Sequence, residues 1–406
     1  MDSLITAAAL ALAAGDPIGA LKRVALRNDA QSLALRGIAM AQLGELARAK
    51  ALLREAARAF GPKEAIARAR CAVAEAEIAL VSRDLAWPTK TLDGARATLE
   101  HRGDRANAAH AGILAARREL LLGHVDDAER TLAGIEAVTL PPALQAERAL
   151  VAMGLAMRRL KTAPARAALA DAKTAARAAR IPALTAEVEN AARMLSAPAA
   201  RLIADGGERT LRLDEVEAVL ASGSLVVDAC RNVVRANGTI VSLSTRPVLF
   251  ALARAMAEAW PGDAARTELL QRAFGARHAD ESHRARLRVE VGRLRAALRP
   301  LADVTATRRG FVLAPREERG VVVLAPPIEE RHAEVLAILA DGEAWSSSAL
   351  AIALGTSSRT VQRALELLAS SGKVEAFGRG RARRWTTPSV PGFPTALLLP
   401  GPLPGG

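Results

Sequence analysis

The sequence predicts a multidomain protein, with an all-α helical repeat array in its first half and two smaller α+β domains in its second. Residues 1–198 are dominated by Ala, Leu, Arg and Glu and contain no strand pattern. Most aromatic residues lie after residue 200, where short β-rich runs and Asn-Gly or Gly-Gly turns first occur. The two halves therefore build different kinds of core.

Composition limits the class of protein. The 406 residues allow about two to four domains, and a 50% hydrophobic share excludes a disordered chain. No apolar run approaches the ~20 residues of a membrane span, so we expect a soluble chain with no membrane partner. Cys71 and Cys230 form no CxxC pair, and no Lys or Arg precedes Lys22. We therefore expect reduced thiols, no signal peptide and a cytoplasmic protein.

The net charge of +13 suggests an acidic partner such as nucleic acid or an anionic membrane. The excess is, however, divided almost equally between the two halves, and nearly all of it comes from Arg in an Ala-rich chain. A GC-rich genome explains such a total equally well. Only local clusters of arginine can indicate function.

Residues 1–198 contain repeated helical units. In one unit Leu53 lies among small residues at Gly37, Gly44, Ala49 and Ala56. Small residues at these offsets allow two antiparallel helices to approach closely. A second unit repeats this spacing of small and apolar residues with Ala116, Gly123, Ala128, Leu132 and Ile135. A third unit has Ala95 and Leu99 at the corresponding positions.

These units resemble tetratricopeptide repeats over about residues 30–195. The step from Ala95 to Ala128 is 33 residues, close to the 34-residue period, but the aromatic consensus positions are missing. A generic Ala-rich helical array is the alternative. The resemblance implies a concave surface that binds a protein or peptide, or self-association into a homodimer.

Residues 203–315 predict the first α+β domain. Its β-rich runs, as in Thr210-Leu-Arg-Leu and Thr239-Ile-Val-Ser, indicate a small antiparallel sheet. Three helices are expected to follow at Arg246–Trp260, Ala264–Phe274 and Ser282–Arg299, and then a hairpin over residues 304–315. The order of sheet, two helices, basic helix and hairpin is that of a winged helix.

The third of these helices carries the clearest pattern. Leu287, Val291, Leu294 and Leu298 form one apolar stripe at helical spacing. Val289 lies on the opposite face, between arginines. An exposed valine among arginines suits a DNA major groove, where Arg reads guanine and an apolar side chain contacts the thymine methyl. A solvated basic helix is the alternative. The arginines of this face are Arg284, Arg286, Arg288, Arg293 and Arg295.

This domain resembles the OmpR/PhoB-type DNA-binding domain. The resemblance rests on Val241–Pro247, Arg266–Leu270, Leu287–Leu298 and Thr307–Leu313. It implies that the third helix enters the major groove and that the hairpin, or wing, reaches the minor groove or the backbone. Arg288, Val289 and Arg293 would then face bases. Phosphate or minor-groove contacts would fall to Arg286, Arg295, Arg308 and Arg309.

Residues 328–387 predict a second winged helix, followed by a Pro/Gly-rich tail over residues 388–406. Gly355 marks a turn, and the Ser357 hydroxyl can cap the helix that follows, in which Val361, Leu365 and Leu368 point inward. A winged helix that binds protein is the alternative. The expected DNA contacts of this domain are Ser357, Ser358, Arg359, Gln362, Arg363, Arg379, Arg381, Arg383 and Arg384.

No catalytic, cofactor or metal site is expected. The six histidines show no HExxH spacing and no neighbouring Cys or acidic cluster, so we expect them at the surface. No phosphate-binding loop or nucleophile elbow occurs. The sequence therefore predicts a bacterial-type transcriptional regulator that binds double-stranded DNA and is not an enzyme. The rival hypothesis is an interaction scaffold whose winged helices bind proteins.

Overall fold

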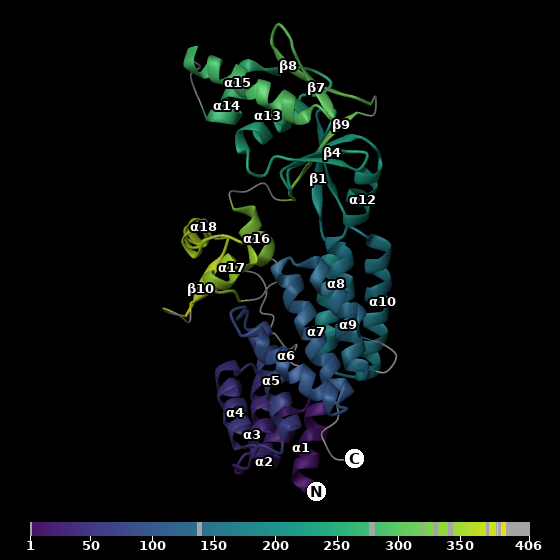
Figure 1. Ribbon diagram of the computed structural model, residues 1–406, viewed down its shortest axis with the longest axis vertical. Coiled ribbons are helices and arrows are strands. Elements are labelled where there is room, and N and C mark those ends of the chain that lie inside the picture. The colour runs from purple at the N-terminus through teal and green to yellow at the C-terminus, as the bar shows by residue number, and fades with distance from the viewer. Residues whose placement is uncertain are drawn as a thin grey trace. The chain divides into compact units, whose positions relative to one another are not determined.

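The computed structural model describes residues 2–135, 140–275, 281–317, 320–327, 332–339, 344–370, 373–378, 380 and 383–386. The chain forms two compact units (Figure 1). The first unit comprises residues 1–159, 163–194 and 332–406, and the second comprises residues 160–162 and 195–331. The expected tail over residues 388–406 lies outside the described residues, as do Arg379 and Arg381.

The N-terminal part of the first unit is all α-helical over its described residues, as expected from its composition. Each helix from α1 to α9 contacts the next one along the chain (Figure 1). Side-chain caps start several of them, for example Asp29 on Ser32 and Asp104 on Asn107. The helices are α1 (Ser3–Ala13), α2 (Pro17–Val24), α3 (Ala30–Gln42), α4 (Leu46–Ala59), α5 (Ala65–Val81), α6 (Thr89–His101), α7 (Arg105–Leu122), α8 (Val125–Ala133), α9 (Pro142–Arg158), α10 (Thr162–Ala179) and α11 (Pro182–Ser196).

Small residues allow close helix contacts, at Gly37 as expected and also at Gly112, which the repeat spacing did not indicate. A Cβ added at Gly37 on α3 would lie 2.9 Å from Leu53 of α4, and one added at Gly112 on α7 would lie 2.9 Å from Ile135. Gly44 and Gly123 both adopt a φ of +83° in the turns after α3 and α7. The same local geometry therefore recurs in the two units with the clearest repeat spacing.

The C-terminal part of the first unit consists of α16 (Ala333–Leu339), α17 (Ser347–Ala353), α18 (Ser358–Ser370), β10 (Glu375–Phe377) and β11 (Arg384–Thr386). Ser346 caps α17 through the amide of Ala349, at 3.1 Å. Trp345 and Trp385 are both buried, and their backbones exchange two hydrogen bonds. Apolar side chains of α5, α6 and α7 share one hydrophobic core with these helices and tryptophans.

The second unit contains a six-stranded mixed sheet in the order β2-β1-β9-β3-β4-β5. Strands β3 and β9 pair in parallel, and the other four pairs of neighbouring strands are antiparallel. Helix α12 (Leu213–Ala221) lies between its second and third strands along the chain. The strands are β1 (Ala200–Ala204), β2 (Gly207–Leu211), β3 (Leu225–Asp228), β4 (Val233–Ala236), β5 (Thr239–Ser242) and β9 (Val321–Ala325).

The expectation of a small antiparallel sheet is wrong, because β9 inserts between β1 and β3. Along β9, Val321 and Val323 enter the core shared with α13, whereas Val322 and Leu324 pack toward α12. A strand buried on both faces reads as a continuous apolar run without alternation, so periodicity does not reveal it. Leu213, which the sequence placed at the end of a β-rich run, instead starts α12.

Three helices and a second sheet complete this unit: α13 (Pro247–Glu258), α14 (Arg266–Phe274), α15 (Glu281–Leu298), and a three-stranded sheet in the order β6-β8-β7. Its strands are β6 (Ala264–Ala265), β7 (Ala302–Ala306) and β8 (Gly310–Pro315). The helix expected from residue 264 begins at Arg266, because Ala264 and Ala265 pair with Phe311 and Gly310. This pairing joins the hairpin to the start of α14.

Candidate nucleic-acid interface

Helix α15 is fixed in the second unit by its apolar stripe. Leu287, Val291, Leu294 and Leu298 are at most 2% exposed and pack into the core that also contains α13 and β8. Burial of four such side chains contributes about 1.5–3 kcal/mol each. The stripe predicted from the sequence is therefore buried, and it orients the opposite face of α15 outward.

The outward face has a central strip of small side chains between two rows of arginine. At 100° per residue, Ala285, Val289, Gly292 and Ala296 fall in the centre of the exposed side. Val289 is 54% exposed, and a Cβ added at Gly292 would meet no atom within 4 Å. A surface of this kind allows another molecule to approach the helix backbone closely. The flanking rows are Arg286 with Arg293, and Arg284 with Arg288 and Arg295.

The arginines of α15 differ in how strongly the chain already holds them. Arg293 pairs with Glu290 at 2.8 Å, and Arg288 lies 3.3 Å from Glu281, yet both arginines are at least 65% exposed. Arg284 also lies near Glu281, at 3.5 Å. Exposed pairs of this kind contribute little and exchange readily for another anion.

Arg286 and Arg295 are more constrained. The Arg286 guanidinium lies over the Phe274 ring, 4.5 Å from its centroid, and Arg295 Nε donates to the carbonyl of Val304 at 2.9 Å. These two side chains fasten α15 to α14 and to β7. Both remain exposed, so their remaining N–H groups can still reach a phosphate.

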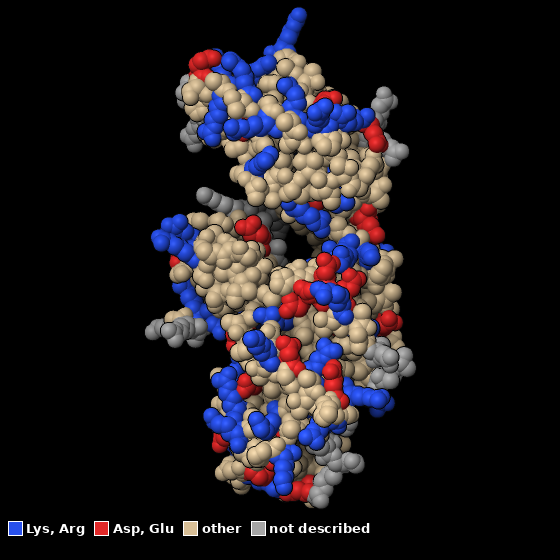
Figure 2. Space-filling model, in the orientation of Figure 1, with Lys and Arg blue, Asp and Glu red and all other residues tan. Residues whose placement is uncertain are grey.

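The turn between β7 and β8 carries Arg308 and Arg309, both exposed. Their side chains make no ion pair with any residue that the structure describes. Arg266 of α14 fixes the turn, because its guanidinium donates hydrogen bonds to the carbonyls of Thr307 and Arg308 at 2.9 and 2.8 Å. Figure 2 shows Lys and Arg side chains gathered over α15 and at the tip of this hairpin.

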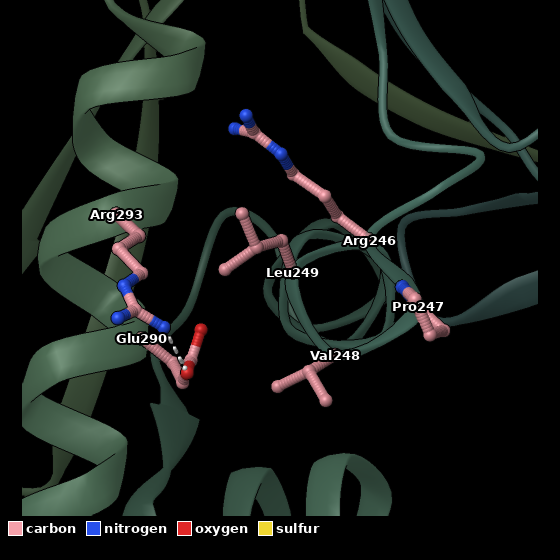
Figure 3. A pocket seen from close by; sticks show the side chains of 6 residues that line it. All are labelled: Arg246, Pro247, Val248, Leu249, Glu290 and Arg293. Carbon is pink, nitrogen blue, oxygen red and sulfur yellow. Dashed lines mark hydrogen bonds and ion pairs between the residues drawn. The ribbon is translucent and has the colours of Figure 1, made fainter.

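A pocket lies between α15 and the start of α13 (Figure 3). Arg293 and Glu290 line it from α15, and Arg246, Pro247, Val248 and Leu249 line it from the first turn of α13. No side chain caps α13, and Pro247 has no N–H, so the amides of Val248 and Leu249 are the free donors of this turn. Two arginines beside an uncapped helix N-terminus suit an anion the size of a phosphate.

The C-terminal elements present a second basic face on α18. Val361, Leu365 and Leu368 are buried as predicted, while Ser358, Arg359, Gln362 and Arg363 are exposed. Arg359 and Arg363 form no ion pair within the described part of the chain. Ser357 serves as the expected cap, since its Oγ accepts from the amide of Thr360 at 3.1 Å. Its hydroxyl is therefore engaged in the helix start.

The basic hairpin of this region is described only in part. The Arg383 guanidinium stacks on Trp385, 4.3 Å from the centre of the ring, and Arg384 donates to the carbonyl of Arg383 at 3.2 Å. The cation–π contact holds the Arg383 side chain against Trp385, so this side chain does not project from the hairpin. Arg379 and Arg381, predicted to contact DNA, lie outside the described residues.

One group of polar side chains was missed from the sequence. His110 was expected at the surface, but its ring is completely buried, and Glu77 and Glu147 lie beside it. These three residues come from α5, α7 and α9, so no local spacing reveals them. A signal does exist, because each places a titratable side chain among buried residues that are mostly Ala, Leu, Ile and Val. Their ligand atoms could hold a metal ion.

Comparison with known proteins gives no relative for this chain: no protein-family model, curated protein or solved structure matches it. Among the described residues, no helix combines the length and the apolar character that crossing a bilayer requires.

Proposed function

We propose that this protein binds double-stranded DNA in a sequence-specific manner and regulates transcription through two winged-helix modules. The first module spans α13 to β8 and the second spans α16 to β11. The observation that carries the proposal is the outer face of α15, where small side chains lie between two rows of exposed arginine. A narrow apolar strip fits against base edges, and flanking arginines fit the phosphates on either side of a groove.

Two features support the same orientation of DNA. The order helix, strand, helix, helix and hairpin, with the sheet order β6-β8-β7, supports a winged helix. In that fold α15 would enter the major groove while Arg308 and Arg309 reach the neighbouring backbone or minor groove. The pocket at the start of α13 would receive a phosphate through Arg246, Arg293 and two backbone amides (Figure 3).

Affinity in this proposal comes mainly from arginines that displace counterions, and sequence choice comes from Arg288, Val289 and Arg293. The helices α1–α11 would bind a protein partner or self-associate and so determine when DNA is engaged. Two modules on one chain would raise avidity where both of their sites lie on the same DNA.

The test is the salt dependence of binding to a pool of random duplexes, followed by fluorescence anisotropy. Arg308→Ala and Arg309→Ala should each lower the slope of log K against log salt by about 0.9, the loss of one phosphate contact. Arg209→Ala is the matched control, because Arg209 is also exposed but lies on β2, paired with Glu215. No binding at low salt, or an equal effect of Arg209→Ala, would exclude the proposal.

The second module is tested by Arg363→Ala in the full chain. A point substitution is preferable to a deletion, because removing α16 to β11 would expose apolar surface on α5, α6 and α7. If this module reads sequence, duplexes selected by the variant from a random pool should lose one of two enriched half-sites. Identical selected sequences would show that α18 contributes no base contacts.

A protein-binding role for the second module is the other candidate, and exposed apolar side chains favour it. Leu367 and Phe377 are each 50% exposed, and Leu367 lies one turn after Arg363 on α18. Large apolar side chains are depleted on surfaces that contact only phosphate. If Leu367→Ser weakens self-association in analytical ultracentrifugation and leaves the salt slope unchanged, α18 is a protein interface.

A further inference from the structure

The buried polar cluster of α5, α7 and α9 combines one imidazole with two carboxylates. His110 is 0% exposed, and the side chains of Glu77 and Glu147 are 4% and 2% exposed. His110 Nε2 lies 3.6 Å from Glu77 Oε2 and 3.7 Å from Glu147 Oε2. Both distances exceed the 2.7–3.2 Å of an N–H···O hydrogen bond.

Three buried atoms of His110 and Glu147 remain without hydrogen bonds in a place where water cannot reach them. Among the described residues, neither nitrogen of His110 has a hydrogen-bond partner, and Glu147 Oε1 has none either. A buried polar atom left unpaired costs about 1–3 kcal/mol. Several such atoms on adjoining side chains indicate a missing common partner rather than separate defects.

The charges around the cluster define that partner. Arg117 pairs with Glu187 and also interacts electrostatically with Glu77 and Glu147, so one positive charge faces three carboxylates. The carboxylates of Glu77 and Glu147 flank the His110 ring. A divalent cation would neutralise both carboxylates.

We propose that Glu77, His110 and Glu147 form a structural site for a divalent transition-metal ion such as Zn²⁺. The ligand atoms all lie within 4.8 Å of one another. Bonds of about 2.0–2.1 Å in a tetrahedron separate ligands by about 3.4 Å, close to the two measured distances. Glu147 Oε1 can supply a fourth ligand through bidentate binding. One imidazole with two carboxylates suits Zn²⁺ better than Ca²⁺ or Mg²⁺, which prefer oxygen alone.

The position of the site makes its role structural. Each ligand comes from a different helix, and these helices are adjacent in the array. The ligands are almost fully buried, so a substrate cannot reach an open coordination position. An ion here would join α5, α7 and α9 at their centre and stabilise the array against separation of its repeats.

The experiment uses the full chain, stripped with EDTA and then titrated with Co²⁺ and with Zn²⁺. We expect one equivalent of Co²⁺ per chain, visible d–d absorption displaced by Zn²⁺, and a rise of several degrees in the midpoint of thermal unfolding. His110→Gln and Glu147→Gln should each weaken binding by more than about 100-fold. Glu147→Gln also removes a buried charge, so this variant should fold without metal even if His110→Gln does not.

The matched control is His124→Ala. His124 lies with Glu119 and Asp127 in a similar but exposed group on the same unit. The variant should bind one equivalent with unchanged absorption. The proposal is overturned if the wild-type chain binds no ion at micromolar metal, if Glu147→Gln binds as the wild type does, or if His124→Ala abolishes binding.

Discussion

The contact between β6 and the hairpin depends on Gly310, and replacing this residue by Ala should release the hairpin. A Cβ at position 310 would lie 1.7 Å from the carbonyl oxygen of Ala264 and 2.7 Å from its carbon. Ordinary Cβ contacts begin near 3.4 Å, so β6 would have to retreat by about 1.7 Å. A displacement of this size breaks hydrogen bonds that need 2.7–3.2 Å.

The cost follows from what this contact holds together. Strand β6 pairs with β8 only through Ala264 with Phe311 and Ala265 with Gly310. Two lost hydrogen bonds at about 0.5–1.5 kcal/mol each, with about 1–3 kcal/mol of overpacking, give a loss of about 2–6 kcal/mol. The bonds from Arg266 to the turn would weaken at the same time, which would free Arg308 and Arg309.

Hydrogen exchange of peptides from residues 302–315, measured by mass spectrometry, isolates this hairpin from the rest of the chain. Gly310→Ala should increase exchange there and weaken DNA binding. Gly94→Ala is the control, since its Cβ meets open space within α6 and should add up to about 1 kcal/mol of helix stability. If the hairpin of the Gly310→Ala variant exchanges hydrogen as slowly as that of the wild type, the reasoning is refuted.

Three further predictions follow from single side chains. Glu290→Gln should tighten DNA binding by a few-fold in the anisotropy assay, because it releases Arg293 from its 2.8 Å ion pair and removes a repulsive charge; weaker binding would contradict this. In EDTA, the free energy of unfolding of the first unit should fall by about 2 kcal/mol at most between about pH 6.5 and 8. The pKa of Glu147 is raised in the folded state, so over this pH range only the folded state holds a proton on this carboxyl. Below about pH 6.5 the titration of His110 offsets the fall in stability, and urea titrations of Glu147→Gln should show no fall. Cys71 is buried and Cys230 is exposed, and burial raises the pKa of the two thiols to about 12 and about 11, so iodoacetamide should modify Cys230 slowly and spare Cys71 until the chain is denatured, as intact-mass measurements can show.

Local patterns in the sequence predicted the parts of the fold that depend on neighbours along the chain. The stripe from Leu287 to Leu298 and the cap at Ser357 both follow from spacing within a single helix. The helical first half followed from composition in the same way. In each case the decisive partner lies within about four residues, so periodicity contains the necessary information.

Features built from distant segments escaped prediction for the opposite reason. Strand β9 is defined by its pairing with β1 and β3, roughly a hundred residues earlier in the chain. The cluster around His110 assembles three helices, and each contributes one polar residue that looks unremarkable alone. Tertiary pairing determines both, and a single sequence carries no record of it.

The placement of arginine distinguishes the charges that stabilise the chain from those that remain for a partner. In the helical array arginines meet carboxylates, as in Arg70 with Asp104 and Arg159 with Asp126 and Glu129. Such pairs are neutral at a distance and contribute little to an external field. Arg308, Arg309, Arg359 and Arg363 have no such partner among the described residues, and they are exposed on the turn between β7 and β8 and on α18. The net charge of +13 therefore understates the attraction of these two surfaces for a polyanion and says little about the array.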